Sequence, residues 1–112
     1  MKEIKAFIHR NRIADVLRAL RQAGLCQRYC CLSVTGVHGT LAALDNQERS
    51  FSAELGAEVI TEAKLELVLE DNEVDAAVSV ICDNARTGQP LAGWIFVTDV
   101  GTAMPIGDSS GP

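Results

Sequence analysis

The chain has 112 residues, of which 47% are hydrophobic, 22% are charged and only 4% are aromatic, and its formal net charge is −5. This composition predicts one globular domain with an aliphatic core, and the acidic balance argues against binding to nucleic acid or to an anionic membrane surface. The apolar runs are far shorter than a membrane span, and the first residues lack an apolar signal segment. We therefore expect a cytoplasmic protein without membrane insertion.

The first third of the chain has the pattern of a strand, a helix and a second strand. Residues 2–8 alternate between apolar and other side chains, which predicts a strand with one buried face. A helix follows, with Asn11 as its expected N-cap and with an apolar stripe at helical spacing made of Ile13, Val16, Leu17 and Leu20. Residues 32–37 are predicted to form the second strand.

The rest of the chain begins with a long polar segment, residues 38–57, which has no steady period and predicts a functional loop. Residues 58–69 alternate like a strand, and a turn at residues 70–72 leads to a second helical stripe made of Val74, Ala77, Val78, Ile81 and Ala85. Residues 94–100 predict the last strand, and residues 101–112 a loose tail.

This order of elements, βαββαβ, defines the fold class. We predict an α+β, ferredoxin-like split βαβ fold: a four-stranded antiparallel sheet with two helices on one face, in a single domain over residues 1–112. Many unrelated proteins share this order, so the fold alone does not identify a function.

Three segments of the sequence resemble the P-II family of signalling proteins. They are LSVTGVHG at 32–39, KLELV at 64–68, and ARTG at 85–88 continuing to GWIFV at 93–97. Their order and spacing resemble the family's second, third and fourth strands over residues 1–106, with the T-loop at about 38–57 and the B-loop at about 86–94.

The resemblance implies a homotrimer that takes part in nitrogen regulation and signal transduction as a regulator, without catalytic chemistry of its own. Family members bind ATP or ADP between subunits, and their T-loops dock onto a membrane transporter or an enzyme. The positions implied for partner binding are Phe51, Ser52 and Leu55. Those implied for nucleotide binding are Ser33, Gly39, Thr40, Glu66, Val68, Thr87, Gly88, Leu91, Ala92, Gly93 and Trp94.

The sequence departs from the family at the positions that meet phosphate. Two family lysines fall at Glu62 and Trp94, and two arginines fall at Pro105 and Gly107. A triphosphate needs such cations. We therefore expect no required cofactor and a ligand such as ADP, AMP or a cyclic nucleotide, with ATP disfavoured.

Four residues also have a simple structural interpretation. Glu62 is expected on a solvated strand face, His9 at the surface near a helix start, and Cys82 in the core. Trp94 is expected in the core or in a subunit contact, with stacking on a ligand ring as the sharper alternative.

Two other functions stay open on sequence grounds. A metal-responsive or metal-tolerance protein linked to metal or anion transport would use Cys30, Cys31 and His38, although their spacing matches no standard zinc or copper motif and ordinary thiols are the simpler explanation. A small enzyme of the acylphosphatase kind needs an arginine-bearing phosphate loop after the first strand and an asparagine. Residues 9–11 match this only weakly, and the loop spacing is wrong.

Overall fold

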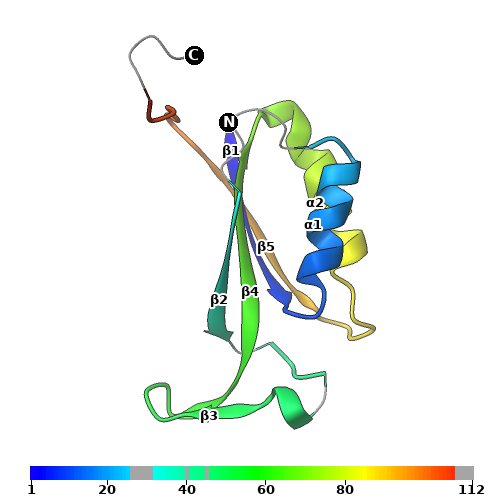
Figure 1. Cartoon of the computed structure of the whole chain (residues 1–112), viewed down its shortest axis with the longest axis vertical. Coiled ribbons are helices and arrows are strands. Elements are labelled where there is room, and N and C mark those ends of the chain that lie inside the picture. Colours follow the sequence, from blue (N-terminus) through cyan, green and yellow to red (C-terminus); the bar gives the residue numbers. More distant parts are fainter. Residues whose placement is uncertain (26–31, 40, 45, 108–112) are drawn as a thin grey trace.

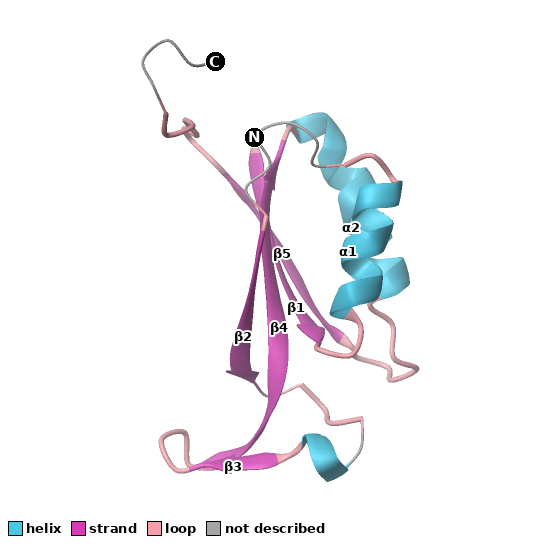
Figure 2. Ribbon diagram, in the orientation of Figure 1, coloured by secondary structure: helices cyan, strands magenta, loops and turns pink. Residues whose placement is uncertain are grey.

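The structure, a computed structural model, describes residues 1–25, 32–39, 41–44 and 46–107. It has two layers: an antiparallel sheet, and two helices that cover one of its faces (Figures 1 and 2). This arrangement confirms the predicted α+β fold. Neither helix is long enough to cross a membrane, and the described residues contain no other helix that could do so.

The body of the sheet has the strand order β2-β4-β1-β5. The two central strands are β1 (Lys2–His9) and β4 (Ala57–Leu69), and the two outer ones are β2 (Ser33–Gly39) and β5 (Gly93–Asp99). All neighbouring pairs are antiparallel. The buried side chains of β1 and β4 include Ile4, Ala6, Ile8, Leu65 and Leu67. The alternation of the sequence in these strands indicated this buried face correctly.

The helices are α1 (Ile13–Gln22) and α2 (Val74–Asn84), and α2 is preceded by a short 3₁₀ turn, η2 (Asp71–Glu73). The core between helices and sheet is aliphatic, as predicted; its fully buried members include Ile4, Ile8, Val16, Leu20, Leu65, Leu67, Ala77 and Ile81.

The start of α1 differs from the prediction. Arg12, and not Asn11, occupies the N-cap, and no side-chain hydrogen bond caps this helix among the described residues. Instead, Arg12 Nε donates to the carbonyl of Asn84 at 3.1 Å, which joins the first turn of α1 to the last turn of α2. Asn11 Nδ2 donates to Glu48 Oε1 at 3.5 Å, so this residue fixes the long loop and not the helix.

The second face of the sheet, which we call the open face, is not covered by helices (Figure 1). Residues that lie opposite one another in an antiparallel ladder project to the same face. Because Ile4, Ala6 and Ile8 are buried under the helices, the intervening Lys5 and Phe7 project to the open face. Their partners on β4 and β5 follow them: Lys64, Glu66, Trp94 and Phe96.

The long polar segment contains regular structure that the sequence did not predict. β2 continues to Gly39, β4 already begins at Ala57, and a short 3₁₀ turn, η1 (Asn46–Glu48), lies between them. A short strand, β3 (Ser50–Ser52), pairs with residues 57–59 of β4. The segment thus ends in a hairpin that extends beyond the body of the sheet (Figure 2).

Candidate functional site at the base of the long loop

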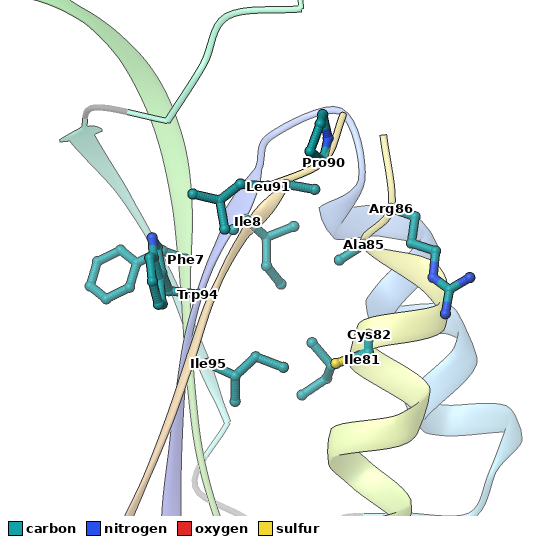
Figure 3. A pocket seen from close by; sticks show the side chains of 12 residues that line it. Phe7, Ile8, Ile81, Cys82, Ala85, Arg86, Pro90, Leu91, Trp94 and Ile95 are labelled. Carbon is teal, nitrogen blue, oxygen red and sulfur yellow. The ribbon is translucent and has the colours of Figure 1, made fainter. Parts of the chain in front are cut away.

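Two hollows lie beside the loop that joins α2 to β5, one on each side of the sheet. The first, of about 200 Å³, lies on the helix side, between the last turns of α2 and the ends of β1 and β5 (Figure 3). Its walls are mainly apolar: Ile8 and Ile95 project toward α2, and Ile81 faces them (Figure 3). Cys82 lines this hollow and is exposed, so its predicted place in the core is wrong; it lies beside the buried stripe of α2 and not on it.

The second hollow, which we call the open-face pocket, has a volume of about 560 Å³ and lies between the long loop and the loop before β5. This volume is within the usual range of small-molecule sites, roughly 300–1,000 Å³. It unites three residues that the resemblance assigned to nucleotide binding, Gly39, Leu91 and Trp94. Its other lining residues are Phe7, Val37, His38, Leu41, Ala42, Glu62 and Phe96.

One wall of the open-face pocket is aromatic. The rings of Trp94 and Phe96 are 6.4 Å apart between centroids and nearly parallel, at 15°, and Phe7 meets Phe96 edge-to-face at 6.2 Å. Phe7 and Trp94 lie on the side of the strands away from Ile8 and Ile95 (Figure 3). Trp94 is 53% exposed. It is therefore not a core residue of this chain, and a flat apolar surface is available to a ligand ring or to a neighbouring subunit.

Glu62 forms the polar end of the same pocket. It is only 4% exposed, so its predicted place on a solvated face is wrong. Its Oε1 accepts a hydrogen bond from the backbone N–H of Leu41 at 2.9 Å, and the carboxyl group packs against Gly39, where a Cβ atom would overlap it. The chain buries this acid by folding the start of the long loop over the end of β4.

His9, paired with Glu62 in the β1–β4 ladder, is also buried, at 1% exposed. The prediction of a surface histidine is therefore wrong. Its Nδ1 lies 3.5 Å from Glu48 Oε2, and Glu48 is itself nearly buried. His9 Nε2 finds no hydrogen-bond partner among the described residues. Burial of a polar edge in this way opposes stability, which is more typical of functional regions than of ordinary cores.

A side-chain bridge joins the two loops that flank the pocket. Gln89 Nε2 donates to the carbonyls of Ala43 at 3.3 Å and Ala42 at 3.4 Å. The side chain of Gln89 is held in turn by Thr87 Oγ1, which lies 3.1 Å from its Oε1. These bonds are long, but they connect segments 46 and 47 positions apart in the sequence. Sequence reasoning missed Gln89 because such contacts between distant loops leave no local pattern.

The loop before β5 depends on two glycines. Gly88 has φ +86°, a conformation that other residues adopt only with strain. At Gly93, a Cβ would overlap the carbonyl oxygen of Phe7 in the neighbouring strand. Gly93 therefore lets β5 lie closely against β1 at the edge of the first hollow, with Ala92 beside it.

The remaining residues implied for nucleotide binding are not part of the open-face pocket of one chain. Ser33 lies opposite Glu66 on the sheet, and Val68 lies further along β4. Glu66 is surrounded by cations: Lys64 Nζ lies 3.3 Å from its Oε1, and Lys5 Nζ lies 4.0 Å from its Oε2. Thr40 lies outside the described residues.

The residues implied for partner binding lie on the hairpin. Phe51, in β3, is 70% exposed, and Leu55, in the turn, is 58% exposed. Ser52 ends the same strand. Exposed large apolar side chains at the tip of a loop are a frequent feature of contact surfaces.

The candidate metal ligands are not brought together in the part of the chain that the structure describes. Cys30 and Cys31 lie outside the described residues, and so does Cys26. His38 is exposed on β2, and the described residues contain no group of three His, Cys, Asp or Glu side chains that could hold a metal ion.

Comparison with known proteins identifies the family to which this chain belongs. The family profile described as "Nitrogen regulatory protein P-II" matches residues 1–108. The chain therefore belongs to the P-II family of nitrogen regulatory proteins, as the resemblance predicted.

Several relatives carry the same description. The Nitrogen regulatory protein P-II of Microchaete diplosiphon is 34% identical over 106 residues, which cover 95% of this chain and 91% of that protein. The Nitrogen regulatory protein P-II 1 of Escherichia coli (strain K12) is 33% identical, with the same coverage. That of Methanothermobacter thermautotrophicus is 31% identical over 89% of this chain and 84% of that protein. These relatives are regulatory proteins by name.

Proposed function

We propose that this chain is a trimeric P-II-type regulator that binds a small effector in clefts between subunits and controls a transporter or an enzyme through its long loop. The observation that carries the proposal is the open-face pocket, whose walls come from both loops at once. An effector that fills it contacts Leu41 and Ala42 on one side and Leu91 on the other. A bound effector therefore contacts the start of the long loop, the segment that leads to the hairpin.

The proposed effector is an adenine nucleotide with few phosphates, such as ADP, AMP or a cyclic nucleotide. Among the described residues that line the pocket there is no lysine or arginine, and Glu62 contributes an acid. Each missing charge-assisted hydrogen bond removes roughly 1.5–3 kcal/mol of phosphate binding. The aromatic wall remains suitable for a base, so a short phosphate chain is favoured over a triphosphate.

A trimer would cover the open face. Trp94 and Phe96, which project to this face, are each about half exposed in one chain, at 53% and 49%. Association of three sheets would cover this apolar face around the pocket, leave the aromatic wall open to the cleft between subunits, and bring Ser33, Glu66 and Val68 toward a neighbour's pocket. The hairpin with Phe51 and Leu55 would stay accessible to a target protein.

Calorimetry on the full chain tests this function. AMP and ADP are expected to bind at least as tightly as ATP, and the protein is expected to have the mass of a trimer at micromolar concentration. A clearly tighter affinity for ATP would contradict the charge argument. A monomeric mass would contradict the intersubunit cleft.

A further inference from the structure

A side-chain bridge ties together the two loops that flank the open-face pocket, and its donor, Gln89, does not itself line that pocket. We propose that Gln89 is a positioning residue of the effector site. It holds the start of the long loop against the loop before β5, so that both walls of the pocket are in place before an effector enters. This inference rests on the proposed function, because it names the residue that prepares the regulator for its effector.

The amide group of Gln89 is used in one orientation. Its nitrogen carries two N–H groups and no acceptor, and it lies 3.3 Å from the carbonyl oxygen of Ala43 and 3.4 Å from that of Ala42. Its oxygen accepts from the hydroxyl group of Thr87 at 3.1 Å. An amide turned by 180° would place its oxygen against the two carbonyl oxygens and lose both hydrogen bonds. The bridge therefore needs a side chain with two donors at its far end.

The backbone around Gln89 leaves this side chain little freedom. Gly88 turns the chain in the left-handed region, at φ +86°, and the N–H of Gln89 donates back to Thr87 Oγ1 at 3.3 Å. Pro90 follows, and a residue before proline is restricted to extended backbone conformations. The half-buried Gln89 therefore forms the bridge at a small cost in conformational entropy.

The bridge acts on the walls of the pocket through the residues next to it. Ala42, whose carbonyl accepts from Gln89, lines the pocket together with Leu41, and Leu91 lines it from the loop before β5. The N–H of Leu41 donates to Glu62 Oε1 at 2.9 Å. The start of the long loop is thus held both by β4 and by the loop before β5. Because the bridge joins two loops of one chain, it acts whatever groups a neighbouring subunit adds to the cleft.

A bridge of this kind strengthens binding without a contact to the effector. The pocket has its volume of about 560 Å³ while the bridge is formed, so an effector can enter without breaking it. When the bridge is lost, the start of the loop adopts other positions, and only a fraction of the chains has both walls in place. The apparent dissociation constant then rises in inverse proportion to that fraction.

Gln89→Leu tests the proposal, because it keeps a side chain of similar size and removes both donors. Calorimetry on the full chain is expected to show AMP binding about tenfold more weakly to this variant than to the wild type, since two modest hydrogen bonds are lost. Gln89→Asn keeps the amide but is one methylene shorter, so it should weaken AMP binding to a similar degree. Gln22→Leu, at the exposed end of α1, is the matched control and should bind AMP like the wild type.

The rates of binding separate positioning from direct contact. NMR line shapes of AMP, recorded with increasing amounts of the full chain, give the association and dissociation rate constants. Loss of a positioning residue is expected to lower the association rate constant about tenfold and to leave the dissociation rate constant unchanged, because fewer free chains are ready to bind. Loss of a residue that contacts the effector would instead speed up dissociation.

The possible failures are distinguishable. Equal affinity of the wild type, Gln89→Leu and Gln89→Asn for AMP overturns the role of Gln89 but leaves nucleotide binding intact. A tighter affinity of Gln89→Leu would mean that the bridge competes with the effector, and a faster dissociation from it would mean that Gln89 contacts the effector; each overturns the proposal. If the wild-type chain binds neither AMP nor ADP at millimolar concentration, the proposed effector class is wrong, and the role of Gln89 with it.

Discussion

The carboxyl group of Glu62 occupies the volume that a side chain at Gly39 would need. These residues lie on adjacent strands, β4 and β2, at the point where the long loop begins. The same carboxyl group holds the N–H of Leu41, two residues beyond Gly39. A glycine at this position therefore allows an acid to reach under the loop and fix its first residues.

Gly39→Ala is expected to displace Glu62 and lower the free energy of unfolding by roughly 1–3 kcal/mol, the usual effect of overpacking. Gly36→Ala is the matched control on the same strand, because the nearest atom to its new Cβ would be Thr61 Cγ2 at 3.9 Å, an ordinary contact. Urea denaturation at fixed protein concentration measures both. In a Glu62→Ala background the Gly39→Ala effect should nearly vanish; an unchanged effect would refute the steric explanation.

Gln89→Leu is expected to release the start of the long loop from the loop before β5. The two hydrogen bonds to Ala42 and Ala43 are lost, each with a net contribution of roughly 0.5–1.5 kcal/mol. Amide hydrogen exchange over residues 41–44 should become several-fold faster, while exchange in the central strands stays constant. Gln22→Leu, at the exposed end of α1, should leave residues 41–44 unaffected.

Binding of AMP is expected to change the fluorescence of Trp94, which is the only tryptophan in the sequence. Its indole ring is about half exposed in one chain, so a ligand ring placed against it should remove water and shift its emission to shorter wavelength. Titration with AMP measures this directly. If calorimetry detects AMP binding while the emission stays constant, the nucleotide lies away from the aromatic wall.

Asp71 should titrate below its ordinary pKa of 3.8, because it accepts a hydrogen bond from the N-terminal ammonium group and is attracted by that charge. A lowered pKa in the folded state means that the contribution to stability is present above pH 3.8. It is lost as the pH falls through the folded-state pKa. NMR titration of the Asp71 carboxyl group measures the shift.

Acetylation of the N-terminus provides the control for Asp71. It removes the ammonium charge, and the pKa of Asp71 should then rise toward 3.8. A pKa that stays low after acetylation would mean that the neighbouring Lys2, and not the N-terminus, is the main cause.

The body of the fold could be predicted from the sequence because its signals are local. Alternation at Ile4, Ala6 and Ile8 indicated a half-buried strand, and the helical stripes through Val16 and Ile81 indicated which helix faces are buried. Such patterns depend on residues close in the chain, and the structure confirms them.

The candidate site could be predicted only in part, because its geometry depends on contacts between distant segments. Alternation places Glu62 and His9 on the face that lacks helices, and solvent exposure was the natural expectation. Their burial results from residues 41–44 and 46–48, which fold back over the end of the sheet. Periodicity within a strand contains no information about such a covering loop, and the role of Gln89 was missed for the same reason.

The length of β4 has a consequence for how the hairpin formed by β3 and the start of β4 can vary in length. Residues 57–59 continue the same strand past the body of the sheet and pair with β3, so the register of the hairpin is set by a strand whose other residues are already fixed by β1 and β2. Adding one residue to each side of the hairpin would advance its tip by about 3.4 Å without disturbing the sheet. A single added residue would instead turn Phe51 to the opposite side. The length of the hairpin can therefore change by one residue on each of its two strands at a time, without a change in the pocket at its base.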